Sequence, residues 1–145
     1  MLKSLFLACS LLTACSSEKC NLEAELLARA GKGATDCGQV LVDGDRTATD
    51  ECVTRAFEDG VAFHARYEAR GIDSHVVLGI VRSASGTLTL LHYDGDPSGG
   101  GGDGQPVIDA AVCDDPRLPP TVSSRPEGTH PFTCGAERSV GRVCE

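Results

Sequence analysis

The chain has 145 residues and is acidic, with 21 Asp and Glu against 13 Lys and Arg and a formal net charge of −8. This balance argues against a nucleic-acid-binding protein of the usual kind, because such proteins neutralise phosphates with basic patches. The length suits one domain, but with no Trp, two Tyr and four Phe the core has few large side chains and needs additional stabilisation.

The first stretch has the features of an export signal. Lys3 gives a basic start, residues 5–12 form an apolar run broken by one serine, and Thr13 and Ala14 are small residues of the kind that precede a cleavage site. The apolar run is far shorter than the ~20 residues that a membrane-spanning helix needs. We therefore predict a signal peptide over residues 1–14.

The cysteine that follows these small residues favours anchoring over secretion. Leu12-Thr13-Ala14-Cys15 resembles the lipobox of bacterial lipoproteins. The resemblance implies that Cys15 is acylated and becomes the first residue of the mature chain, held to membrane lipid at the cell envelope. Two or three acyl chains hold a protein firmly, whereas one binds only marginally. Ser16 implies the outer membrane if the source is Gram-negative, and an ordinary secretory signal is the alternative reading.

Residues 15–19 are then a short tether, and residues 20–145 form the folded domain. A first helix is predicted over residues 21–30, with an asparagine as its N-cap and a glycine after it. A second, long helix is predicted over residues 47–70 from an apolar stripe that covers about half of the helix circumference. His64 falls within this stripe and is expected to be a hydrogen-bonded core or edge residue rather than a ligand.

Strands are predicted after the second helix, where β-branched residues alternate between turns of Gly and Ser. A short additional strand lies between the two helices, and the proline-rich stretch before the last strand is expected to be irregular. The fold class is therefore α+β: a long helix packed on a small antiparallel meander of three to four strands, with a short N-terminal helix. The predicted strands cover residues 39–42, 74–82, 87–93, 106–113 and 130–134.

Six cysteines remain in the predicted domain, and they predict a disulfide-stapled fold. An even number in an oxidising compartment indicates three disulfides, and no Cys-x-x-Cys pair supports redox or zinc chemistry. Several connectivities are compatible with the sequence. Cys113 and Cys134 end predicted neighbouring strands, so we predict that they pair. Cys37 with Cys52 is the second predicted pair, and Cys20 with Cys144 is the pair that remains.

The glycine-rich stretch after the second predicted strand carries several oxygen donors. Asp94-x-Asp96-x-Ser98 resembles the first half of an EF-hand calcium loop, and Asp103 adds a carboxylate. The resemblance implies that these four residues bind calcium with an affinity of ~10⁻⁴–10⁻³ M. Gln105 stands where that loop has its bidentate Glu, and the flanks are strands rather than helices. The favoured reading is a flexible, acidic connection between the second and third main strands, with calcium binding as the alternative, and no other cofactor is expected.

No catalytic motif is present: Gly-x-Ser-x-Gly and His-Glu-x-x-His are both absent. His75 and His92 lie on strands predicted to pair and could meet across them as an incomplete metal site, but the favoured reading is that both are exposed strand residues. We therefore predict a membrane-anchored envelope lipoprotein that is a non-enzymatic binding or structural module. Its expected partner is an envelope or surface protein or another envelope component, bound by a loop-borne surface around residues 94–131.

Two alternatives remain open. One is a small ligand-binding or enzymatic domain with its pocket between helix 49–70 and the sheet, faced by His64 or His92. The other is a calcium-stabilised module that uses the loop over residues 94–104.

Overall fold

The computed structural model describes residues 20–100, 104–119 and 126–144. The predicted signal peptide, the lipid site at Cys15, the tether and Asp103 lie outside the described residues. Within the described part of the chain, neither helix is long and apolar enough to cross a membrane.

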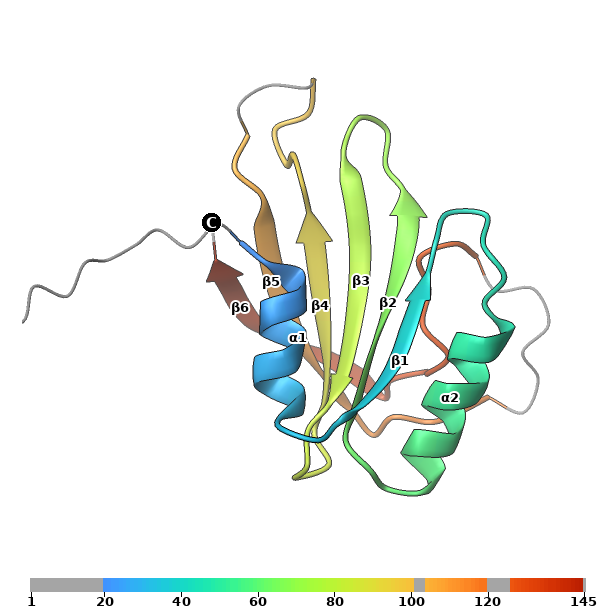
Figure 1. Cartoon of the computed structure of the whole chain (residues 1–145). Helices are drawn as coiled ribbons and strands as arrows, with labels where there is room; N and C mark the ends of the chain where they lie inside the picture. The colour runs from blue at the N-terminus through green and yellow to red at the C-terminus, as the bar shows by residue number, and fades with distance from the viewer. Residues whose placement is uncertain (1–19, 101–103, 120–125, 145) are drawn as a thin grey trace, which may run out of the picture.

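The domain is built on one six-stranded mixed sheet whose strands lie side by side in chain order (Figure 1). The first two strands run parallel and are connected through a helix, and every other neighbouring pair is antiparallel. This sheet corrects the predicted fold, which had a long helix on a three- to four-stranded antiparallel meander. The elements are α1 (Leu22–Ala30), β1 (Thr35–Val40), α2 (Thr47–Glu58), β2 (Phe63–Arg70), β3 (His75–Arg82), β4 (Leu88–Asp94), β5 (Val107–Asp114) and β6 (Ala136–Cys144).

The predicted long helix over residues 47–70 is wrong, because its second half forms β2. The helix ends at Glu58, and Gly60 turns the chain with a φ of 72°. Beyond it, Phe63, Ala65 and Tyr67 alternate and are almost fully buried. Their spacing fits an apolar face of a strand as well as a helical stripe, and pairing with β1 on one side and β3 on the other decides for the strand.

The last strand was also predicted in the wrong place. Residues 130–134 contribute only an isolated bridge between Arg117 and Thr133, and β6 follows them. β6 is an edge strand whose first seven residues are exposed, so its sequence carries charged side chains instead of an apolar alternation. The early short strand was predicted at residues 39–42, and β1 overlaps only its first part.

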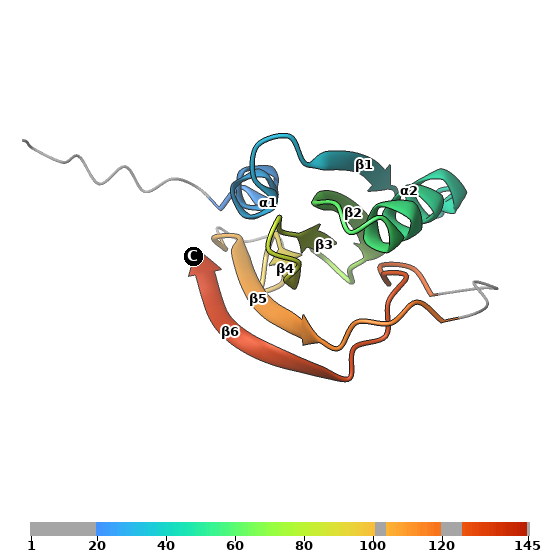
Figure 2. The same ribbon diagram turned by 90° about the horizontal axis from the view of Figure 1, so that it is seen from below.

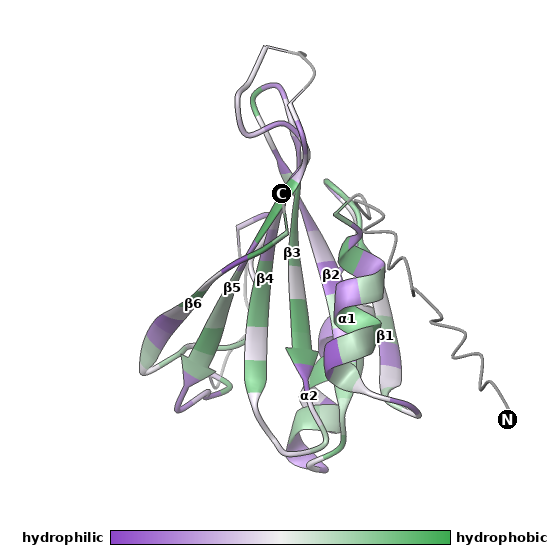
Figure 3. Ribbon diagram, turned by 90° about the vertical axis from the view of Figure 1, so that its left-hand side faces the viewer, coloured by the Kyte–Doolittle hydropathy of each residue, from purple (hydrophilic) through white to green (hydrophobic). Residues whose placement is uncertain are grey.

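Figure 2 shows α1 and α2 on opposite sides of the sheet. The α1 side has its own core, and Figure 3 shows hydrophobic segments in the central strands that form it. Gly79 of β3 lets the helix approach closely, since an added Cβ would lie 3.0 Å from Leu26 and 3.1 Å from Leu22. The core on this side comprises Leu22, Leu26, Ala30, Val77, Val81, Leu91, Ile108 and Ala110.

The other side of the sheet is covered by α2 and by the irregular segment before β6. Val53 and Ala56 of α2 pack on the buried aromatic residues of β2, so this helix lies directly against the sheet. Leu118 and Phe132 bring the segment after β5 onto the same core. The stretch predicted as an irregular surface segment is therefore partly a core element.

The three predicted disulfide pairings are confirmed. One joins β1 to α2, one joins the end of β5 to the segment that covers the sheet, and one joins the residue before the N-cap of α1 to the end of β6. The bridged pairs are Cys37–Cys52, Cys113–Cys134 and Cys20–Cys144.

Candidate functional site

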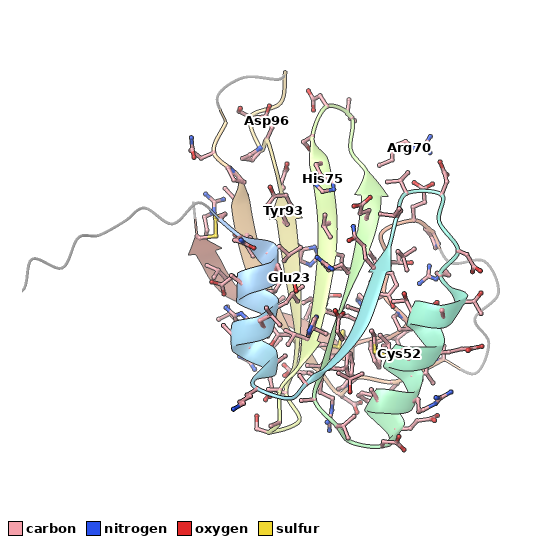
Figure 4. The ribbon with its side chains drawn as sticks, in the orientation of Figure 1. Glu23, Cys52, Arg70, His75, Tyr93 and Asp96 are labelled. Carbon is pink, nitrogen blue, oxygen red and sulfur yellow. A yellow bond between two sulfur atoms is a disulfide. The ribbon has the colours of Figure 1, made fainter. Side chains whose placement is uncertain are left out.

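A groove of 330 Å³ lies on the α1 side of the sheet, beside the first turn of the helix. We call it the α1 groove. Its walls come from α1 and from β1 to β4, and Figure 4 labels three of its residues: Glu23, His75 and Tyr93. Its lining residues are Cys20, Asn21, Leu22, Glu23, Gln39, Arg66, His75, Val77 and Tyr93.

The register of the sheet brings the side chains of the groove together. Gln39 of β1 is paired with Arg66 of β2, and Val77 of β3 is paired with Tyr93 of β4. Residues directly opposite in paired strands point to the same face. Local sequence gave no sign of this groove, because its residues come from four strands whose pairing is set by long-range contacts.

Hydrogen-bonding groups of both charges line the α1 groove. Arg66 Nη1 lies 2.7 Å from Glu23 Oε2, which joins β2 to the helix. Beside this pair, Glu68 Oε1 accepts a hydrogen bond from Gln39 Nε2 and lies 3.3 Å from His75 Nε2. The ring of His75 meets that of Tyr93 edge-on, with 6.0 Å between the ring centroids.

This arrangement is suited to binding a polar partner. Glu68 orients the imidazole of His75, as a carboxylate does for a general base. A nucleophilic reaction also needs an activated hydroxyl, thiol or amine within reach. Among the described residues that line the groove, the Cys20 sulfur is bonded to Cys144, and Tyr93 supplies the one hydroxyl.

A larger hollow of 550 Å³ lies along α2, but its described lining comes from a single stretch. Every described residue that lines it falls between Arg46 and Glu58. A binding site usually gathers groups from several elements around one point. The α1 groove meets this condition and the hollow on α2 does not.

The predicted pocket between the long helix and the sheet is not formed by His64 or His92. His64 is 2% exposed and pairs with Val81, which packs under α1, so it lies on the side opposite α2. His92 is exposed and stands opposite Leu78, on the other face from His75. His75 and His92 therefore do not meet across their strands, and both are exposed, which is the reading favoured from the sequence.

The predicted calcium loop is held by hydrogen bonds among its own donors and acceptors. Asp94 Oδ1 accepts from the backbone N–H of Asp96 at 3.1 Å, and Asp96 Oδ1 accepts from Ser98 Oγ at 2.7 Å. Sequence reasoning missed Asp73, whose Oδ2 accepts from the N–H of Gly100 at 2.7 Å. Asp73 belongs to the β2–β3 connection, so only the folded sheet brings it to this loop.

Metal-ligand atoms come together elsewhere. Among the described residues, His130, Cys134 and Glu137 place such atoms within 4.8 Å of one another. Cys134 is oxidised in its disulfide with Cys113, and His130 Nδ1 lies 3.2 Å from the backbone N–H of Phe132. This cluster therefore offers no thiolate ligand. Calcium binding at the Asp94 loop is a separate matter and stays a prediction.

A further group of charges closes the loops beside α2. Arg70 forms ion pairs with Asp43 and Glu127, and a hydrogen bond with Asp43 raises the pKa of Glu127. Hydrogen bonds from the backbone N–H and the hydroxyl of Thr47 lower the pKa of Asp45. Both shifted carboxyl groups are exposed, and their hydrogen bonds hold the start of α2 and the neighbouring loop in place.

The predicted loop-borne binding surface divides into two separate parts. Residues 94–100 lie beside His75 at the α1 groove, since Gly95 donates its N–H to the carbonyl of His75 at 2.9 Å. Of the described residues after Asp114, Leu118 instead packs on the α2 side. Comparison of the chain with protein-family models, with curated proteins and with solved structures finds no match, so the proposals below rest on this geometry.

Proposed function

We propose that this protein is a lipid-anchored component of the bacterial cell envelope that binds another envelope protein through the α1 groove. The observation that carries the proposal is the position of Cys20. It lines the groove, it is bonded to Cys144, and it stands five residues after the lipobox cysteine Cys15. The anchor and the groove are thus expected at the same end of the domain.

The charge of the chain supports anchoring by acyl chains. With a net charge of −8, the protein is repelled by anionic headgroups. Adhesion through basic residues is therefore unfavourable, and the acyl chains on Cys15 supply it.

Replacing Cys15 with Ser is expected to release the protein from the membrane. The wild-type chain should fractionate with membranes and carry acyl mass on its N-terminal cysteine, whereas the Cys15→Ser variant should be unacylated and soluble, with its three disulfides intact. Cys9→Ser is the matched control, because Cys9 lies inside the predicted signal peptide and should not affect anchoring. Membrane fractionation and intact mass measure both results, and an acylated, membrane-bound Cys15→Ser variant contradicts the anchor.

Binding through the α1 groove is tested by placing a photoreactive amino acid at Tyr93 in living cells. A discrete cross-linked product should form from this position. The matched control is Ala84, an exposed residue in the β3–β4 connection at the far end of β3. Equal cross-linking from both positions would exclude a specific surface at the groove.

Calcium stabilisation is a second candidate, favoured by the convergence of Asp73 and the Asp94 loop. An affinity of ~10⁻⁴–10⁻³ M predicts that ~10 mM calcium stabilises the fold by roughly 1.4–2.7 kcal/mol. Thermal melts in calcium and in chelator measure this shift, and Asp96→Asn should abolish it. Identical melting curves under both conditions argue for a purely structural loop.

A further inference from the structure

The β2–β3 connection presents one large apolar side chain to water. Ile72 is 103% exposed, against 58% or less for the other exposed large apolar residues of the described chain. Gly71 keeps the connection tight, because an added Cβ there would collide with the carbonyl oxygen of Ser74. The fold thus holds Ile72 at the tip of the connection, with its apolar side chain fully exposed to water.

Ile72 lies at the end of the sheet where the anchor is expected. His75, three residues further along the chain, lines the α1 groove together with Cys20. The neighbouring loop is tied to the same connection, because Asp73 accepts from Gly100. Figure 1 shows the β2–β3 connection and residues 94–100 at one end of the sheet, and the β3–β4 connection at the other.

The length of the tether limits how far this end can be from the bilayer. Five residue steps separate Cys15 from Cys20, and at ~3.5 Å per residue they span at most roughly 17 Å. An acylated Cys15 therefore keeps Cys20, and with it the α1 groove that His75 also lines, close to lipid. Tethering raises the effective concentration of the domain at the bilayer, so a single apolar side chain becomes sufficient for a second contact with lipid.

We propose that Ile72 inserts into the bilayer interface as a second membrane contact and so sets the orientation of the domain. The proposal rests on the lipid anchor at Cys15. The charges around Ile72 specify the lipid: Asp73, Asp94 and Asp96 lie at this end, and Arg70 is engaged by Asp43. Acidic side chains are repelled by anionic headgroups, so the fitting surface is a bilayer of zwitterionic phospholipid.

The absence of Trp from the sequence makes a direct test possible. Ile72→Trp gives the full-length, lipidated protein one fluorescent reporter, and Ala84→Trp places the same reporter at the far end of the sheet as the matched control. Each variant is reconstituted on phosphatidylcholine and phosphatidylethanolamine vesicles with brominated acyl chains. The indole of the Ile72→Trp variant is expected to shift its emission to the blue and to be quenched, while that of the Ala84→Trp variant keeps its emission in water. Intact mass verifies three disulfides in both variants.

The outcomes separate this inference from the anchor. If both variants float with the vesicles and the reporter of Ile72→Trp stays exposed to water, the anchor holds and the second contact is wrong. If neither variant floats, the anchor fails and the second contact fails with it. Equal quenching in both variants shows that the domain has no fixed orientation and overturns the proposal.

Adding anionic phosphatidylglycerol at low salt is expected to weaken the quenching in Ile72→Trp, and an unchanged signal overturns the assignment to zwitterionic lipid.

Discussion

Replacing Cys20 and Cys144 together with Ala is expected to lower the free energy of unfolding by about 4–5 kcal/mol. This disulfide joins residues 124 apart in sequence, and a longer closed loop removes more entropy from the unfolded chain. Both sulfurs also pack against the core on the α1 side. Without the bond, the start of α1 and the end of β6 are held only by local contacts. Equilibrium unfolding in urea, followed by circular dichroism, measures the loss.

A second double variant provides the matched comparison. Cys37 and Cys52 are only 15 residues apart, so chain entropy predicts a smaller loss of about 3 kcal/mol when both are replaced with Ala. If the Cys37–Cys52 variant loses more unfolding free energy than the Cys20–Cys144 variant, burial of Cys37 rather than chain entropy dominates the stabilisation. The two variants also differ in location, since only the first disulfide borders the α1 groove.

The fold was predictable where local sequence and tertiary structure favour the same element. Asn21 does cap α1, with its Oδ1 accepting from the N–H of Ala24 at 3.1 Å. The β-branched runs did give β3, β4 and β5 close to their predicted bounds. Of the disulfide pairs, only Cys113–Cys134 was predicted from the ends of neighbouring strands. Cys37 and Cys52 lie inside β1 and α2, and Cys20–Cys144 was the pair that remained.

The wrong predictions share a physical cause, which is that pairing partners override local patterns. The Phe63–Arg70 segment has apolar residues at spacings that fit both a helix and a strand. β6 is an exposed edge strand with charged side chains, so its sequence lacks the apolar alternation that predicts a strand. The α1 groove was not predictable for the same reason, since Arg66 lies in what was predicted as a helix. Likewise, only the folded sheet brings Asp73 to the predicted calcium loop.

Replacing Asp50 with Ala is expected to lower the free energy of unfolding by about 2–4 kcal/mol. Asp50 is 6% exposed and accepts hydrogen bonds from Arg46 Nε at 2.6 Å and from the Tyr67 hydroxyl at 2.8 Å. Arg46 also donates to the carbonyl of Thr129 at 2.8 Å and lies 5.4 Å from the centroid of the Tyr67 ring. One carboxylate therefore joins the first turn of α2 to β2 and to the segment that covers the sheet.

The loss in the Asp50→Ala variant comes mainly from the charge that remains behind. Breaking a buried pair from one side costs about 3–5 kcal/mol, and the partial exposure of Arg46 (21%) reduces this because water reaches its guanidinium.

Tyr67→Phe removes a single hydrogen bond and should cost only about 1 kcal/mol. A double-mutant cycle in urea measures the coupling between Asp50 and Tyr67, which is expected to be at least about 0.5 kcal/mol for residues in one network. Additive losses would mean that Asp50 acts through Arg46 alone, and an Asp50→Ala variant as stable as the wild type would show that the network contributes no stability.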